Sequence, residues 1–128
     1  MAISYALQVA CLTQALYHEA RGESIAGQEM VAQVIRNRVH SPMFPDDYCS
    51  VIKQPGQFSF NPNKGMIERG AYERAHDVAV NVMADNVRYS PVDYDVISYH
   101  TSSVNPRWNP SKLKLARKLG NHVFYKQS

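Results

Sequence analysis

Two stretches near the start of the chain carry apolar side chains at every third or fourth position, and this spacing constrains the fold more than any other feature. The first stretch runs from Ser4 to Ala20, and its recurring positions are Leu7, Cys11, Leu12, Ala15, Leu16 and Glu19. The second follows Gly22 and Ser24, and its stripe consists of Met30, Val31, Val34, Ile35 and Val39. Such a period places side chains on one face of a helix. The sequence therefore predicts two helices, with Gly22 as the stop of the first and Ser24 as the cap of the second.

The rest of the chain predicts shorter elements. They are, in chain order, a turn capped by Asp46 or Asp47 that runs through Ile52, a loop at 55–65, a helix at 70–86, strands at 96–101 and 122–125, and between the strands a basic helix from Ser111 to Leu119 that ends at Gly120. No repeat or linker divides the 128 residues. We expect one domain spanning residues 1–128, with an α+β fold that is mainly α-helical and has a small β element.

Composition excludes several classes of protein. Hydrophobic residues at 45% and charged residues at 20% exclude intrinsic disorder, collagen-like repeats and a disulfide scaffold. No apolar run approaches the roughly 20 residues of a membrane span, and the N-terminus lacks the basic start and cleavage site of a signal peptide. We expect a soluble monomer. Cys11 and Cys49 allow one disulfide or two buried thiols, and the apolar surroundings of Cys11 favour thiols.

Positive charge gathers at the C-terminal end. Of the net charge of +3, six cations and no acid lie between Arg107 and Ser128, which leaves eight cations against eleven acids in residues 1–106. A basic end on an acidic body predicts attraction to an anionic partner. No nucleic-acid-binding motif accompanies these cations, and the net charge is small for such a protein, so we expect no nucleic-acid partner. Anionic cell-wall or outer-membrane polymers are the partners that we expect for this segment.

The sequence His18-Glu19 prompts a test for the zinc motif HExxH. That motif needs a second histidine four residues after the first, and this chain has Gly22 there. The remaining histidines, His40, His76, His100 and His122, lie far apart without ligand spacing. We therefore expect neither a metal site nor a cofactor.

Glu19 is the main candidate for catalysis. It shares a helix face with Leu12 and Leu16, so its carboxyl group is expected to point inward, where loss of water raises the pKa and favours the protonated form. A protonated carboxyl group is the general acid that glycoside cleavage requires. The alternative is a structural ion pair with Arg21 or Arg38, and the spacing alone favours the ion pair.

Other polar and aromatic residues are candidates for a binding cleft. Glu23 is a candidate second acid, or else a carboxylate that ties a loop near the start of the second helix. Gln57, Phe58 and Ser59 lie in a loop bounded by Pro and Gly, where an aromatic ring between hydrogen-bonding groups suits a sugar. A second polar and aromatic set consists of Tyr99, His100, Asn105 and Trp108. Aromatic residues in such sets serve the core more often than a cleft, and Asn37 and Arg38, late in the second helix, are expected to be solvated or to cap loops.

A series of motifs in fixed order makes the chain resemble a known family. The motifs are Tyr17-His18-Glu19-Ala20-Arg21-Gly22-Glu23-Ser24, Gly27-Gln28, residues 31–35, Asn37-Arg38-Val39, Phe44-Pro45, Val51-Ile52 and Gln57-Phe58-Ser59. Together they resemble the SleB-like cell-wall hydrolases, the family of spore cortex-lytic enzymes and related phage and bacterial lysins. The resemblance covers residues 12–60, resumes at Trp108 and at residues 120–124, and is weak between Asn61 and Arg107.

The resemblance implies a peptidoglycan glycosidase with a lysozyme-like or lytic-transglycosylase-like fold. It makes Glu19 the catalytic acid, places Gln57, Phe58 and Ser59 along the cleft, has Asn37 brace it, and leaves Tyr99 as the best candidate on the first strand to face substrate. The bond is the β-1,4 link between N-acetylmuramic acid and N-acetylglucosamine, so glycan strands are the expected partner. One glutamate suffices for a lytic transglycosylase. The alternatives are a hydrolytic muramidase that uses Glu19 with Glu23 or water, and a non-catalytic wall-binding module.

The expected place of action is the bacterial wall, in the periplasm or outside the cell. A phage endolysin without a signal peptide waits in the host cytoplasm until it is released, and this is the setting that we expect. An excised domain of a secreted enzyme has the same sequence features.

Overall fold

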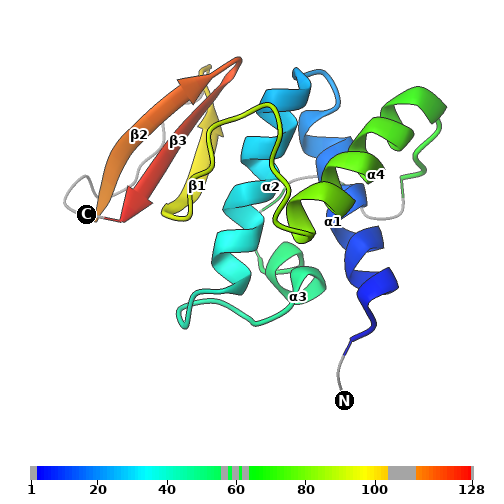
Figure 1. Cartoon of the computed structure of the whole chain (residues 1–128), viewed down its shortest axis with the longest axis horizontal. Coiled ribbons are helices and arrows are strands. Elements are labelled where there is room, and N and C mark those ends of the chain that lie inside the picture. The colour runs from blue at the N-terminus through cyan, green and yellow to red at the C-terminus, as the bar shows by residue number, and fades with distance from the viewer. Residues whose placement is uncertain (1–2, 56–57, 59–60, 62–63, 104–111, 128) are drawn as a thin grey trace.

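The computed structural model describes residues 3–55, 58, 61, 64–103 and 112–127. Four helices, α1 (Tyr5–Ala20), α2 (Ile25–Val39), α3 (Tyr48–Ile52) and α4 (Arg69–Met83), precede three strands, β1 (Val96–Thr101), β2 (Leu113–Leu119) and β3 (His122–Gln127). Figure 1 shows the sheet on one side of α2, and α1 and α4 on the other. The predicted α+β, mainly helical fold is confirmed. Within the described residues, no helix has the length and apolar character needed to span a membrane.

Helices α1, α2 and α3 begin where side-chain oxygens accept hydrogen bonds from the first turn, whereas α4 has no side-chain cap. Ser4 accepts from the Leu7 N–H at 3.2 Å, Ser24 from the Gly27 N–H at 3.1 Å, and Asp47 from the Ser50 N–H at 2.8 Å. The predicted cap at Ser24 is confirmed, and Asp47 rather than Asp46 begins α3. The third predicted helix ends at Met83, three residues early. The chain leaves α4 through Asp85, whose φ of 58° lies in the left-handed region that commonly ends helices.

Most of the core is formed where α1, α2 and α4 meet. It holds completely buried side chains from each helix, together with Val96 of β1 and Phe124 of β3. Most of the predicted apolar stripes are buried, with Leu12 and Leu16 of α1 and Val34 and Ile35 of α2 at 0% exposure. Leu7, in the first turns of α1, is 52% exposed, so the stripe of α1 is buried only beyond it. Burial of these side chains, at about 25 cal/mol per Å² of apolar surface, is the main force that holds the helices together.

The three strands form one antiparallel sheet in the order β1-β3-β2. Residues 113–119 are therefore a strand, and the predicted helix from Ser111 to Leu119 is wrong over this stretch. Gly120 and Asn121 form the turn that joins β2 to β3, and Gly120 has a φ of 60°. A two-residue Gly-Asn connection is a hairpin signal. The prediction that Gly120 ends a helix is therefore wrong, since this glycine lies in a hairpin turn.

A disulfide joins Cys11 of α1 to Cys49 of α3, with Cα atoms 5.3 Å apart. The preference for two buried thiols is therefore wrong. The two cysteines are 38 residues apart, and they meet because α3 packs against α1. That packing is a long-range event which the apolar surroundings of Cys11 in the sequence do not reveal.

Candidate active site

Glu19 lies in the last turn of α1, beside the core. Leu16 and Ala20, its neighbours on the helix, are buried, and Glu19 itself is half-buried. The helical period of the sequence determines this position, since residues 12, 16 and 19 share one face. The end of α1 thus holds a carboxyl group at the border between the core and solvent. Its catalytic role stays a prediction.

The sheet brings Tyr99 to the same place. Tyr99 pairs with Phe124 across β1 and β3, and the two rings lie 5.9 Å apart on the face of the sheet that packs toward the helices. Burial raises the pKa of the Tyr99 phenol, the negative charge of Glu19 raises it further, and the positive charge of Arg38 opposes the shift. An influence of this kind requires proximity, because charge interactions weaken with distance. Two candidates 80 positions apart in the sequence therefore lie near one another in the fold.

The two arginines that are candidate ion-pair partners of Glu19 have contacts with other parts of the fold, and these contacts do not test a pair with Glu19. Arg21 pairs with Glu68 at 3.5 Å and lies over the ring of Tyr17 at 4.8 Å. The Nε of Arg38 donates to the Ile97 carbonyl oxygen at 2.7 Å. Burial lowers the pKa of the Arg38 guanidinium, against the opposing influence of Tyr99. Arg38 is thus buried beside β1 and not solvated as expected.

The segment before α4 contacts the end of α1. The hydroxyl of the buried Tyr17 accepts a hydrogen bond from the Glu68 N–H at 3.0 Å. Burial lowers the pKa of His18, while a hydrogen bond with the Lys64 backbone opposes the shift.

In the described part of the chain, no group of three or more His, Cys, Asp or Glu side chains is arranged to hold a metal ion. The site as described offers carboxyl, phenol and imidazole groups for proton transfer.

Of the predicted loop residues, the structure places one. Phe58 is half-buried and packs against the core, so at least part of its ring serves packing. Gln57 and Ser59 lie outside the described residues, as do Asn105 and Trp108. Their part in a cleft stays a prediction.

Glu23 lies in the turn between α1 and α2, and its side chain is 10% exposed. Its Oε1 accepts from the Asn121 N–H at 2.9 Å, and its Oε2 accepts from Nδ2 of the same residue at 3.1 Å. His122 Nδ1 lies 3.4 Å from Oε1. These contacts are those of a carboxylate that ties one turn to another, the alternative that the sequence left open.

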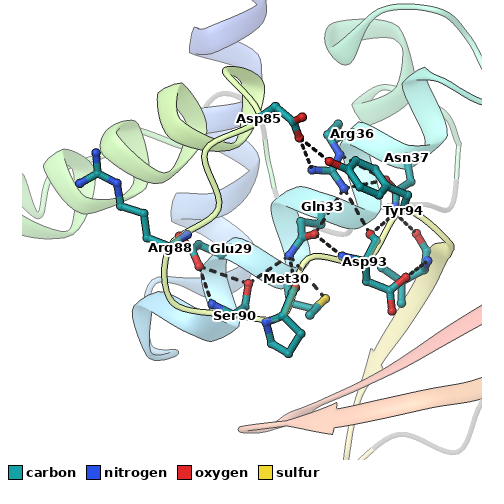
Figure 2. A network of polar contacts seen from close by, with 12 residues as sticks. Glu29, Met30, Gln33, Arg36, Asn37, Asp85, Arg88, Ser90, Asp93 and Tyr94 are labelled. Atoms are coloured by element: carbon teal, nitrogen blue, oxygen red, sulfur yellow. Dashed lines mark hydrogen bonds and ion pairs between the residues drawn. The ribbon is translucent and has the colours of Figure 1, made fainter.

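Polar side chains on α2 hold the chain between α4 and β1, and this is the feature that the sequence reading missed. Figure 2 shows the network. Asn37 Nδ2 donates to the carbonyl oxygens of Asp93 at 2.9 Å and Val96 at 2.8 Å, while its Oδ1 accepts from Arg36. Gln33 Oε1 accepts from the Asp93 N–H at 2.8 Å. Glu29, Gln33 and Asn37 are spaced four residues apart among the apolar residues of α2, and this spacing is the sequence feature that indicates the network.

These contacts give Asn37 a bracing role on the protein's own backbone. It is 6% exposed and fastens the first residue of β1 to α2. It also lines an open pocket of about 810 Å³ between residues 40–42, the chain before β1, and the end of β3. Glu19 and Tyr99 are not among the described residues that line this pocket. Asn37 therefore supports the strand that carries Tyr99, and its predicted role as a brace or lining residue of the substrate cleft stays a prediction.

Comparison with known proteins identifies the family. The sequence profile of the cell wall hydrolase family matches residues 22–125. The spore cortex-lytic enzyme of Bacillus subtilis (strain 168) is 29% identical over 114 residues, which cover 88% of this chain and 35% of that protein. The enzyme of the same name from Halalkalibacterium halodurans is 31% identical over 114 residues, 88% of this chain and 33% of that protein. This chain thus spans about a third of the length of these relatives.

Solved structures agree with the sequence comparison. The catalytic domain of the germination-specific lytic transglycosylase SleB from Bacillus anthracis has a TM-score of 0.73 and 26% identity, with 98% of each chain covered. The catalytic domain of the Bacillus cereus SleB protein has a TM-score of 0.75 at 24% identity, with 98% of this chain and 94% of that chain covered, and shows the shared fold. Because the profile match covers most of its length, this chain belongs to the cell wall hydrolase family, a family of enzymes.

Proposed function

We propose that this chain is a single catalytic domain that cleaves the β-1,4 bond between N-acetylmuramic acid and N-acetylglucosamine in peptidoglycan, as a lytic transglycosylase. The observation that carries the proposal is the half-buried carboxyl group of Glu19 in the last turn of α1, at the border of the core, with Tyr99 close enough for the charge of Glu19 to act on its phenol. The similarity to a catalytic domain named as a lytic transglycosylase supports it. No cofactor enters the proposed reaction.

In this mechanism Glu19 acts first as a general acid. Its carboxyl group donates a proton to the leaving glycosidic oxygen as positive charge develops at the anomeric carbon. The N-acetyl carbonyl of the substrate stabilises that charge. Glu19, now ionised, accepts the proton of the muramyl 6-hydroxyl, whose oxygen bonds to the anomeric carbon. The products are a 1,6-anhydro sugar and a new chain end, and the carboxyl group is restored to its protonated form.

The hydrolytic alternative requires a water molecule in place of the 6-hydroxyl, activated by Glu19 or by Glu23. Both oxygens of Glu23 already accept hydrogen bonds from Asn121, which favours the route through Glu19 alone. The remaining candidates for contact with glycan are Tyr99 and the Gln57-Phe58-Ser59 loop. Asn37 would brace this cleft through β1.

We further propose that the enzyme works at the wall, in the periplasm or outside the cell. The Cys11–Cys49 disulfide supports this setting, because disulfides persist mainly in oxidising compartments. A phage endolysin that is held in the host cytoplasm and then released fits the same chemistry. The cations of the C-terminal segment would bind anionic wall or outer-membrane polymers, and the enzyme would act as a monomer.

The test is the replacement Glu19→Gln, assayed by turbidity loss of purified peptidoglycan and by mass spectrometry of the released muropeptides. The amide keeps the size of the side chain and delivers no proton, so activity should fall by about a hundredfold or more. The exposed Glu73→Gln on α4 is the matched control and should keep full activity. An active wild type should release 1,6-anhydro products.

Two results would contradict the proposal. A Glu19→Gln variant with more than about a tenth of wild-type activity would remove Glu19 as the general acid. Binding to walls without any loss of turbidity by the wild type would identify the chain as a wall-binding module.

A further inference from the structure

The side chain of Glu23 fastens the turn of the β2–β3 hairpin to the turn between α1 and α2. The backbone N–H and the side-chain amide of Asn121 each donate to one of its oxygens, at 2.9 and 3.1 Å. These residues are 98 positions apart in the sequence, so the contact is purely tertiary. The side chain of Glu23 is only 10% exposed, and both of its oxygens accept hydrogen bonds from the protein itself.

Only a glycine fits at position 120 beside this contact. Its φ of 60° is a conformation that other residues adopt with strain, and a Cβ atom there would lie 2.7 Å from Glu23 Oε1. The hairpin turn and the carboxylate thus fit one another without space for another atom. A carboxylate that contacts substrate needs access to an open cleft, whereas the carboxylate of Glu23 packs against this turn.

The contact leads on to the candidate active site through two further side chains. His122, the first residue of β3, has its Nδ1 3.4 Å from Glu23 Oε1. The His122 ring meets the ring of Tyr99 edge-on, with 5.0 Å between centroids. Tyr99 in turn lies within the electrostatic influence of Glu19. Two contacts thus join Glu23 to Tyr99 by way of His122, and Tyr99 lies near the proposed acid.

We propose that Glu23 is a positioning residue: by holding Asn121 and His122 it keeps Tyr99 in place beside Glu19, and it exchanges no proton with substrate. This inference rests on the proposed function of Glu19. In this proposal Glu19 transfers the proton, and Glu23 only holds other residues in place. A shift of the hairpin turn would misplace Tyr99 and slow the reaction, since small errors in the position of reacting groups are costly.

The experiment exchanges the carboxylate and the amide across the contact. In Asn121→Asp two carboxylates face one another and repel, so kcat should fall by about tenfold or more at pH 7. In Glu23→Gln the amide can still pair with Asn121 once the Asn121 side-chain amide rotates, so kcat should stay within about threefold of wild type. In the Glu23→Gln/Asn121→Asp double variant, the new amide donates to the new carboxylate, and kcat should return to within about threefold of wild type.

The controls separate positioning from folding and from the charge of the variants. Neither Glu23 nor Asn121 belongs to the hydrophobic core, so all three variants should keep a cooperative melting transition, with the largest loss of melting temperature in Asn121→Asp. Asn86→Asp adds a negative charge at another exposed position and should leave kcat unchanged. The defect of Asn121→Asp should also shrink as the pH falls and the paired carboxylates become protonated, which a general loss of folding would not produce.

The outcomes distinguish this inference from the proposed function. If Glu19→Gln is inactive and Glu23→Gln is inactive as well, Glu23 takes part in the chemistry and the positioning role is overturned. The same conclusion follows if the double variant is no more active than Asn121→Asp alone. If Glu19→Gln keeps its activity, the proposed function fails whatever the Glu23 variants do. Recovery of kcat in the double variant, with 1,6-anhydro products unchanged, supports the inference.

Discussion

The buried carboxylate of Glu29 on α2 accepts two hydrogen bonds from Ser90, from its N–H at 2.8 Å and from its hydroxyl at 3.2 Å. The same carboxylate accepts from the N–H groups of Arg88 at 2.9 Å and Tyr89 at 2.7 Å. Glu29 is 1% exposed, so these donors replace water around its charge. The result is a fixed path for the chain that leaves α4 and leads into β1 (Figure 2).

Glu29→Gln should therefore destabilise the fold, although it keeps the size of the side chain. The amide nitrogen would face backbone N–H donors, and a buried donor without an acceptor costs about 1–3 kcal/mol, with more for groups that contact a charge. We expect the free energy of unfolding in urea to fall by at least about 2 kcal/mol. Glu73→Gln, at an exposed site with one ion pair to Arg69, should change it by less than about 1 kcal/mol. Equal unfolding midpoints for the two variants would argue against this role of Glu29.

The Cys11–Cys49 disulfide should make stability sensitive to reductant. It closes a loop of 38 residues, for which the loop-closure estimate is about 4 kcal/mol. The melting temperature of the oxidised wild type should fall on reduction, toward that of a Cys11→Ser/Cys49→Ser double variant. The double variant itself should not respond to the reductant. Two titratable thiols in the native protein, purified under oxidising conditions, would contradict the pairing.

Stability should fall as the pH drops below about 6.5. Burial lowers the folded-state pKa of His18 and of His122 below the value of 6.5, with Glu23 opposing the shift at His122 and His100 adding to it. Between the lowered pKa and 6.5 the unfolded chain binds protons that the folded chain does not, so protons favour unfolding. The stabilisation is therefore present above pH 6.5 and is lost as the pH falls toward the folded-state pKa values.

The measurement is the free energy of unfolding from pH 7.5 to 5, for the wild type and two variants. His122→Gln should reduce the slope of stability against pH, because one of the two groups no longer titrates. His40→Gln, which replaces an exposed histidine at the end of α2, is the second variant measured and controls for the loss of a histidine as such. A steeper slope for His122→Gln than for the wild type would show that the sign is wrong.

The cations near β2 should help the enzyme reach whole walls. Lys112, Lys114 and Lys118 carry their charge on or next to this strand, while Arg117 pairs with Asp93 at 3.6 Å. If the three lysines attract anionic polymers, activity on walls should fall as salt shortens the screening length, which is about 10 Å at 0.1 M. Replacing all three with Gln should flatten that salt response and leave cleavage of a short soluble glycan intact.

The matched control replaces three exposed cations elsewhere, Lys53, Arg69 and Arg74, with Gln. It removes the same charge and should keep the salt response of the wild type. If both triple variants have an equal effect, the salt response depends on the net charge of the protein and not on the position of the lysines near β2. Lysines on an edge strand also discourage pairing between sheets, and an unchanged salt response would leave them that role alone.

Local information in the sequence determined the helices. Period and caps lie within a few residues of one another, so Ser24 and the stripes of Leu12 and Leu16 could be predicted from the sequence alone. The position of Glu19 at the inner end of α1 followed from the same period. The order of motifs around Glu19 also indicated the family, which the profile match over residues 22–125 confirms.

Contacts between distant residues decided the rest. The polar residues on α2 that hold the chain before β1, such as Glu29, look like surface residues until that chain lies against them. Residues 113–119 became a strand because β3 offers a partner, and the Gly120-Asn121 turn was the local signal for this pairing. The disulfide required α3 to pack on α1. The proximity of Tyr99 to Glu19 and the hydrogen bonds between Glu23 and Asn121 arose only when the sheet packed beside the helices. Charges and hydrogen bonds act over short distances, and the sequence does not show which distant residues come that close.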